Sequence, residues 1–233
     1  MNLFRAVVED TLALVYPNLC VACGKTVPAR RYYLCTGCLH DLPRTHFHRD
    51  PANPLAMTFW GRVRLEYAAA WFHYTRGSRF PRLIHAMKYL GRKELGYELG
   101  RLYATELAAS PLTEAQLVIP VPLHPQKQRK RGFNQSEWIG RGIAEGLHLP
   151  MAADNLYRAV HTSTQTRKSR IERWQNVARV FRLKDPHLLE NRHILLVDDV
   201  VTTGATMESC AGVLLECTGV RVSLAALGYA SQW

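Results

Sequence analysis

Apolar residues follow a helical period in the middle of this chain and form short continuous runs in its second half. Residues 79–90 and 94–109 carry apolar side chains three or four positions apart, which predicts two helices with one buried face each. From residue 117 onward, apolar runs at 117–121, 194–197 and 220–227 alternate with helical patterns at 136–147 and 207–217. This alternation predicts an α/β domain with a mainly parallel sheet and helices on both of its faces.

Other stretches have a less regular pattern. Residues 60–74 are rich in aromatic and β-branched side chains and predict the two strands of a hairpin, and residues 157–160 predict a short strand. Residues 41–56 hold three prolines among polar residues, which is typical of a linker. On the helix at 79–90, His85 and Lys88 could each face a site, but a surface role is expected for each residue taken alone.

The apolar run at 194–197 leads into two adjacent aspartates, Asp198 and Asp199, and then into a turn of small residues. Adjacent ionised groups at the end of a buried strand are unfavourable without a partner, which favours a functional site over an ordinary strand and capped helix. Carboxylates accept hydrogen bonds from sugar hydroxyls or hold a hydrated magnesium ion. A strand–loop–helix junction offers free N–H groups and a favourable dipole to a phosphate. The residues of this predicted cradle are Thr202, Thr203, Gly204, Ala205 and Thr206. The segment therefore predicts a sugar-phosphate site.

A second candidate anion site follows the strand at 117–121. Four cationic side chains lie within residues 127–131, directly before Gly132 and the helix at 136–147. Cations next to a helix start are suited to phosphate groups. The alternative is a solvated basic turn, but the position directly after a core strand favours an anion site.

Composition narrows the class of protein only in part. The 233 residues carry a formal net charge of +11, with a pI near 9.6, which favours phosphorylated substrates, nucleic acid or acidic membranes without choosing among them. No run of about 18 apolar residues exists, so no transmembrane helix is predicted. Glu9 and Asp10 interrupt the apolar pattern of residues 1–16, and no small-residue cleavage site follows. A short amphipathic helix in a cytoplasmic protein is therefore expected rather than a signal peptide.

Two C-x2-C knuckles lie near the start of the chain. Their cysteines are Cys20, Cys23, Cys35 and Cys38. Two pairs of thiolates on tight turns predict a closed four-sulfur zinc site of the structural kind. Disulfides are the alternative, which the absence of a secretion signal disfavours, and a redox C-x-x-C normally occurs singly. Cys210 and Cys217 lie on the helix at 207–217 and are expected to be core residues.

Residues 194–206 resemble the phosphoribosyl pyrophosphate (PRPP) loop of the type I phosphoribosyltransferases. In that family the acidic pair holds the ribose 2- and 3-hydroxyls and the following loop binds the 5-phosphate. The resemblance implies these roles for Asp198 and Asp199 and for residues 202–206. The family binds pyrophosphate with the loop after the first core strand. The matching residues are Pro122, Leu123, His124, Arg129, Lys130 and Arg131.

The run V-P-L-H-P…K-R-G-F-N-Q-S and the pattern R…T-x-x-Q…R-x-x-N…F are similar to the ComF (competence, amidophosphoribosyltransferase-like) proteins. Because the knuckles, the basic segment and the acidic segment occur in the family's order, the resemblance extends over essentially the whole chain. It implies a helix and a zinc-ribbon-like module in residues 1–50. A Rossmann-like type I phosphoribosyltransferase domain would follow in residues 51–233, with hood elements at 56–110 and a core at 116–233.

The resemblance also implies a function: displacement of pyrophosphate from ribose C1 of PRPP, with Mg²⁺, by an acceptor that the sequence does not identify. Residues 161–169 correspond to a mobile loop of the wider family, so Arg131, Arg167 and Lys168 are expected to neutralise the leaving pyrophosphate. The alternative is a non-catalytic protein of the competence machinery that binds single-stranded DNA, with competence or replication proteins as partners. The charge of +11 agrees with that alternative, but no stacking platform beside the basic segment is evident. The sequence does not indicate an oligomeric state.

Overall fold

The computed structural model describes residues 18–27, 33–159 and 180–230. The helix predicted within residues 1–16 and the loop predicted at 161–169 lie outside these ranges. Within the described ranges, no helix is long and apolar enough to cross a membrane.

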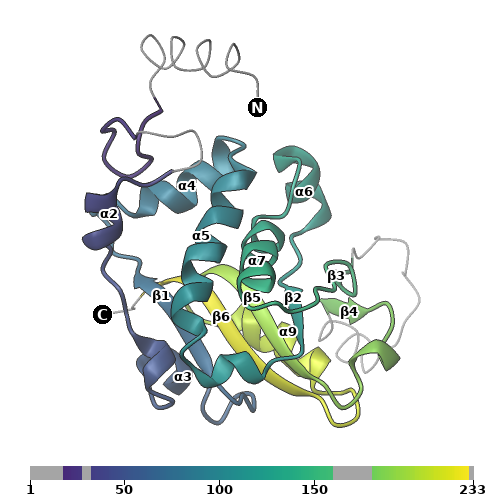
Figure 1. The fold of residues 1–233 in the computed structure, drawn as a ribbon. Coiled ribbons are helices and arrows are strands. Elements are labelled where there is room, and N and C mark those ends of the chain that lie inside the picture. Colours follow the sequence, from purple (N-terminus) through teal and green to yellow (C-terminus); the bar gives the residue numbers. More distant parts are fainter. Residues whose placement is uncertain (1–17, 28–32, 160–179, 231–233) are drawn as a thin grey trace.

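A four-stranded sheet forms the centre of the molecule, in the order β1 (Ala68–His73), β6 (Arg221–Tyr229), β5 (His193–Val201) and β2 (Leu117–Pro120). All three pairings are parallel, which confirms the predicted parallel sheet. Residues 194–197 of β5 are buried without the alternation of a one-sided strand. Such a strand needs cover on both faces of the sheet, and helices supply it (Figure 1).

The predicted helices are present with small shifts of their ends. They are α4 (Pro81–Tyr89), α5 (Lys93–Leu107), α7 (Gln135–Gly146) and α9 (Ala205–Leu214). Helices α5 and α7 pack so closely that a Cβ atom on Gly100 would lie 2.2 Å from the carbonyl oxygen of Ile139. A Cβ atom on Gly142 would lie 2.0 Å from the carbonyl oxygen of Tyr97. Glycine at both positions therefore permits the contact that seats α7 over β5.

The predicted hairpin at 60–74 is wrong. Only β1 forms there, and it pairs in parallel with β6, so its partner comes from the far end of the sequence. Its residues Ala68 to Phe72 are all buried, since the small alanines and the two aromatic rings fill the edge of the core. A hairpin requires a second strand within residues 60–74 that pairs antiparallel with β1, and no such strand forms there.

The predicted linker at 41–56 is folded against β1 rather than extended. It contains η1 (Phe47–Arg49) and leads into α3 (Pro54–Met57). The amide nitrogen of the buried Asn53 donates hydrogen bonds to the carbonyl oxygens of Phe47, Asp50 and Ala68, and its carbonyl oxygen caps α3. The prolines of this stretch therefore belong to a packed turn structure.

The remaining elements are short. A two-stranded antiparallel sheet of β3 (Leu156–Arg158) and β4 (Phe181–Leu183) confirms a strand close to the one predicted at 157–160. The other short helices are α2 (Thr36–His40), η2 (Pro111–Glu114), α6 (Pro125–Arg131) and η3 (His187–Leu189). Residues 126–131, expected as a loop, are therefore helical: His124 caps α6 at its start, and Gly132 ends it with a positive φ of 83°.

Candidate functional site

The acidic pair lies on β5, just beyond the point where the neighbouring strand β2 ends. The last ladder partners of β2 and β5 are Pro120 and Val197, and the N–H of Val121 donates to the carbonyl oxygen of Val197 at 2.8 Å. Beyond this point β5 continues only beside β6, so Asp198 and Asp199 emerge next to the segment that leaves β2. Ligands of parallel α/β sheets bind outside the carboxyl ends of the strands, and this edge is such a place.

Asp198 has neutral hydrogen-bond donors as its direct partners. Its Oδ1 accepts from the hydroxyl of Ser136 at 2.7 Å and from the backbone N–H of Asp199 at 2.8 Å. Ser136 is held in the first turn of α7, where its own N–H donates to the Asn134 side chain at 3.1 Å. Burial, together with the neighbouring Asp199 carboxylate, raises the pKa of Asp198 to about 7. The carboxyl group is thus partly protonated near neutral pH.

Asp199 has a cation as its partner. Its side chain is 5% exposed, and Nζ of Lys88 lies 2.9 Å from each of its oxygens. The geometry is that of a hydrogen bond only toward Oδ1, and Oδ2 accepts a hydrogen bond from none of the described residues. The expectation that Lys88 has an ordinary surface role is therefore wrong, because α4 carries it into the site.

The loop after β5 presents small polar residues to solvent. Thr202, Thr203, Ala205 and Thr206 are exposed, and the Ala205 N–H donates to the Thr203 hydroxyl at 3.5 Å. Gly204 caps α9 with a φ of 76°, in the left-handed region that favours glycine. The loop therefore combines exposed hydroxyls with the free N–H groups at the start of a ten-residue helix.

Two residues that sequence reasoning missed hold this loop in place. A Cβ atom on Gly204 would lie 2.8 Å from Cε1 of the buried Phe59, so the backbone of the loop rests on that ring. Arg62 donates to the carbonyl oxygen of Thr203 at 3.1 Å and pairs with Glu208 of α9. Arg62 lies within the segment expected as a hairpin and Phe59 directly precedes it, so no local pattern indicated these contacts.

Gly204→Ala should destabilise the protein by about 2–4 kcal/mol, from left-handed backbone strain and overlap with Phe59. Gly212→Ala is the matched control: Gly212 lies in the same helix, and a Cβ atom there meets nothing within 4 Å. That change should stabilise the protein by about 0.5–1 kcal/mol. Chemical denaturation measures both, and equal effects of the two substitutions would contradict this account of the loop.

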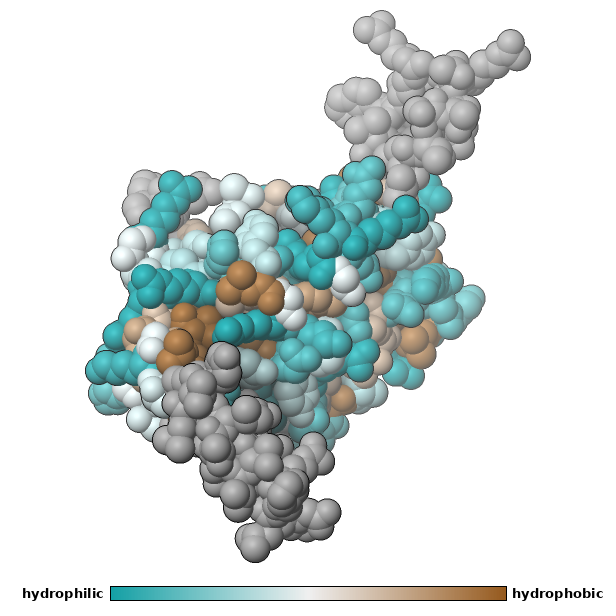
Figure 2. Space-filling view, turned by 90° about the horizontal axis from the view of Figure 1, so that it is seen from above, coloured by the Kyte–Doolittle hydropathy of each residue, from teal (hydrophilic) through white to brown (hydrophobic). Residues whose placement is uncertain are grey.

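The basic segment forms α6, with Arg129 and Lys130 exposed and Arg131 half-buried at its end. The guanidinium of Arg131 donates to the side chain of Gln135 and lies 5.8 Å from the centre of the Tyr89 ring. Tyr89 is the neighbour of Lys88, so the end of α4 lies between the basic segment and the acidic pair. The other residues of this predicted site, Pro122, Leu123 and His124, connect β2 to α6. Figure 2 views the molecule from above, the side on which α6 lies in Figure 1, and much of the coloured surface there is hydrophilic, with smaller apolar patches among it.

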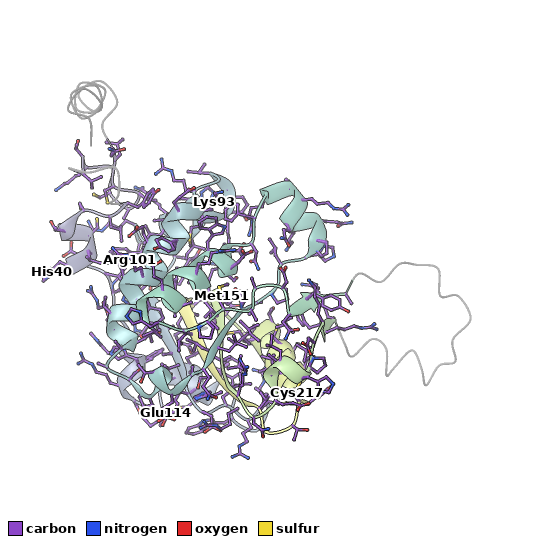
Figure 3. All side chains as sticks on the ribbon, turned by 45° about the vertical axis from the view of Figure 1, so that its right-hand side comes forward. His40, Lys93, Arg101, Glu114, Met151 and Cys217 are labelled. Atoms are coloured by element: carbon purple, nitrogen blue, oxygen red, sulfur yellow. The ribbon has the colours of Figure 1, made fainter. Side chains whose placement is uncertain are left out.

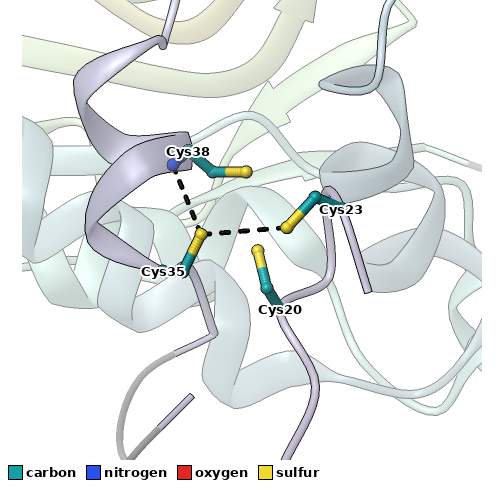
Figure 4. Close-up of side chains that lie close together, drawn as sticks. All are labelled: Cys20, Cys23, Cys35 and Cys38. Carbon is teal, nitrogen blue, oxygen red and sulfur yellow. Dashed lines mark hydrogen bonds between the residues drawn. The ribbon is translucent and has the colours of Figure 1, made fainter. Parts of the chain in front are cut away.

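The four cysteines of the knuckles converge on one point (Figure 4). Their Sγ atoms all lie within 4.8 Å of one another, and Sγ of Cys23 and Cys35 are 3.8 Å apart. None of the four forms a disulfide. Although burial opposes ionisation of Cys20, hydrogen bonds from the backbone of Cys35, Cys23 and Ala22 outweigh it and lower the pKa of that thiol to about 6. The cluster could therefore hold a metal ion such as zinc, and it uses no histidine.

The remaining sequence predictions concern two further cysteines and two cations of the loop at 161–169. Cys210 is fully buried in α9, as expected, whereas Cys217 is only partly buried just beyond that helix. Arg167 and Lys168, expected to cover the reacting centre, lie outside the described residues.

Curated proteins of similar sequence extend over most of this chain. The chain is 33% identical over 211 residues to the "DNA utilization protein YhgH" of Escherichia coli (strain K12), an alignment that covers 88% of this chain and 87% of that protein. It is 34% identical over 100 residues to "Competence protein F" of Haemophilus influenzae, covering 42% and 44% of the two chains. It is 31% identical over 143 residues to "Competence protein ComFC" of Bacillus subtilis, covering 61% and 56%. No family model matches the chain.

Solved structures that resemble this one include a PRPP amidotransferase and a purine phosphoribosyltransferase. Glutamine PRPP amidotransferase from B. subtilis gives a TM-score of 0.40 at 23% identity, covering 55% of this chain and 25% of that enzyme. A purine phosphoribosyltransferase from Pyrococcus horikoshii gives 0.37 at 11% identity, covering 58% and 83%.

Proposed function

The chain belongs to the ComF family, and we propose that it binds PRPP and transfers its phosphoribosyl group, releasing pyrophosphate. The observation that supports this most strongly concerns Oδ2 of Asp199, a buried acceptor at the carboxyl edge of the sheet. It lies 2.9 Å from Nζ of Lys88 but accepts a hydrogen bond from none of the described residues. A buried carboxylate oxygen without a donor is unfavourable, and a sugar hydroxyl supplies the missing hydrogen bond. The N–H groups in the first turn of α9 lack partners within the helix and are suited to a phosphate group of the same ligand.

Each part of PRPP then has a set of residues suited to it. Asp198 and Asp199 accept hydrogen bonds from the ribose hydroxyls. The 5-phosphate lies in the cradle of Thr202, Thr203, Gly204, Ala205 and Thr206. The pyrophosphate faces the segment from Pro122 to Arg131, with Arg129, Lys130 and Arg131 as its cations. If Mg²⁺ were bound with the pyrophosphate, it would neutralise part of the charge that these cations face.

The reaction is a displacement at ribose C1. The acceptor supplies the electron pair of the new bond to C1. The bond between C1 and the pyrophosphate oxygen breaks, and pyrophosphate departs with the electron pair of that bond. Because the transition state resembles an oxocarbenium ion, no covalent nucleophile is needed, and the protein has to stabilise the leaving group and exclude water. Arg131, Arg167 and Lys168 take that role in this proposal. The four-cysteine cluster holds a structural zinc ion away from the reaction, and the protein works in the cytoplasm.

Transfer is tested by measuring pyrophosphate release from PRPP and Mg²⁺ in the presence of a panel of nitrogenous bases and amines. We expect at least one acceptor to accelerate release by the wild type and not by the Asp198→Asn/Asp199→Asn variant. Release that is equal in the two proteins would reject catalysis at this site.

A second candidate function, binding of single-stranded DNA, is favoured by one exposed aromatic residue. Tyr89 is 68% exposed, its ring lies 4.7 Å from that of His85, and Arg131 lies over it. These three side chains form a small cationic and aromatic surface beside the basic segment. The sequence alone did not indicate such a stacking platform. Exposed rings beside a basic segment stack bases and contact the strand's phosphates.

Tyr89→Ala should weaken binding of a single-stranded oligonucleotide about tenfold, since base–aromatic stacking contributes about 1–3 kcal/mol. Tyr157→Ala, which removes an exposed tyrosine of β3, serves as the control and should leave affinity unchanged. Fluorescence anisotropy at several salt concentrations measures both the affinity and its salt dependence. A flat response to salt would reject DNA binding through the basic segment.

A further inference from the structure

The cation at the acidic pair comes from a part of the chain far from both phosphate-binding segments. Lys88 lies near the end of α4, which docks on the core through its buried residues Leu83, Ile84 and Met87. This docking fixes the helix from which the lysine extends, and Nζ meets both oxygens of Asp199 at 2.9 Å. The lysine side chain is 26% exposed, so the pair is only partly hydrated.

The two acids consequently have different environments. Asp198 is held by the Ser136 hydroxyl and by a backbone N–H, both of which are neutral donors. Asp199 is more deeply buried and carries the ion pair. Removing a carboxylate from water is unfavourable unless a counter-charge or hydrogen bonds compensate its lost hydration, and Lys88 supplies the counter-charge for Asp199.

We propose that Lys88 is a positioning residue that holds Asp199 in place and leaves the hydrogen-bond-accepting direction of its Oδ2 to a ligand hydroxyl rather than to a metal ion. This inference rests on the proposed PRPP site and assigns to that site a residue outside its two loops. Lys88 acts through Asp199, which would itself contact the sugar.

The chemistry of the donor set supports a hydroxyl over a metal ion at this carboxylate. Mg²⁺ requires near-ideal octahedral oxygen ligands, and an ammonium group 2.9 Å from both oxygens of Asp199 competes for the lone pairs and repels a second cation. A ribose hydroxyl is neutral and can donate to Oδ2 while the ion pair stays intact. Direct coordination of Mg²⁺ by Asp199 therefore does not fit the residues present, and the ion belongs with the pyrophosphate.

The test uses ribose 5-phosphate as a probe, because it has the sugar hydroxyls and the 5-phosphate but no pyrophosphate. Wild-type protein should bind it equally well in EDTA and in Mg²⁺. Lys88→Met should weaken binding of the probe, and of PRPP with Mg²⁺, at least tenfold, and Lys88→Arg should restore most of the lost affinity. Lys184→Met is the matched control, since it removes a lysine from an exposed ion pair with Asp154, and it should bind as the wild type does.

Three results separate the possibilities. Unchanged affinity of folded Lys88→Met, with PRPP binding by the wild type, would overturn the role of Lys88 and leave the proposed function intact. A requirement for Mg²⁺ in binding of ribose 5-phosphate would overturn the choice of a hydroxyl over a metal ion. Failure of the wild type to bind either ligand would reject the proposed function itself. Lys88→Gln, which keeps a donor for Asp199, gives the same comparison if Lys88→Met does not fold, with affinity between those of the methionine variant and the wild type expected.

Discussion

Asp198→Asn should raise the thermal stability of the protein at pH 8, and Asp199→Asn should lower it. The two side chains are neighbours in one strand and share one proposed ligand, yet their surroundings differ. Asp198 has neutral donors and lies next to another carboxylate, whereas Asp199 is paired with Lys88. Removing the charge therefore relieves an unfavourable interaction at one position and breaks a favourable one at the other.

The sign of the Asp198 effect follows from its pKa. Burial raises the pKa of this carboxyl from 3.8 to about 7, so between these values the folded state binds more protons than the unfolded state. Ionisation of Asp198 therefore lowers the free energy of unfolding progressively as the pH rises from about 4 to 7. Above pH 7 this loss of stability stays constant. Asparagine can accept the same two hydrogen bonds without the charge, so we expect stabilisation on the order of 1–3 kcal/mol at pH 8 and less at pH 5.

The Asp199 effect has the opposite sign because the partner remains. Asp199→Asn leaves the Lys88 ammonium without its counter-charge in a partly buried place, which should cost about 2 kcal/mol. Asp154→Asn removes the carboxylate of an exposed pair and should change stability by less than about 0.5 kcal/mol. Denaturation of the three variants and the wild type at pH 5 and pH 8 gives the comparison. Destabilisation by both Asp198→Asn and Asp199→Asn, or an Asp198→Asn effect independent of pH, would contradict this assignment of charges.

Loss of the metal ion expected at the cysteine cluster should destabilise the residues around the two knuckles most. We expect one zinc ion per chain by metal analysis, and none in Cys35→Ser, because a closed four-thiolate set loses most of its affinity with one ligand. Structural zinc contributes about 10 kcal/mol or more of apparent binding free energy in small modules, so local unfolding of residues around the knuckles should accompany the loss.

Cys217→Ser is the matched control for this substitution. Cys217 lies far from His40, which belongs to the helix α2 that carries Cys38 (Figure 3). The control should keep its zinc and its protection from proteolysis near the knuckles. Full retention of metal by Cys35→Ser, or no metal in the wild type, would reject the zinc assignment.

The sequence contained the parts of this site whose signals are local. An uninterrupted apolar run indicates a strand that is buried on both faces, and β5 is such a strand. The small-residue turn after it ends at the start of α9, as predicted, and two C-x2-C spacings brought four thiols together. Pro125 at the first helical position and Gly132 directly after the last are local signals of the short helix that the basic segment forms.

The contacts that complete the site join residues far apart in the sequence. Lys88 and Asp199 are 111 positions apart, and Ser136 and Asp198 are 62 apart. A lysine on an amphipathic helix has the same local pattern whether it faces solvent or an aspartate. Only the docking of α4 distinguishes the two, and that docking depends on the tertiary core. The parallel pairing of β1 with β6 could not be predicted for the same reason, because it joins residues as far apart in the sequence as Ala68 and Leu224.

The central claim, that the acidic pair and the following loop form a PRPP site, is tested most directly by calorimetric titration of PRPP with Mg²⁺. The wild type should bind in a saturable manner at one site per chain, and the Asp198→Asn/Asp199→Asn variant should bind at least 100-fold more weakly while remaining folded. Absence of binding by the wild type, or equal affinity of the double variant, would contradict the claim.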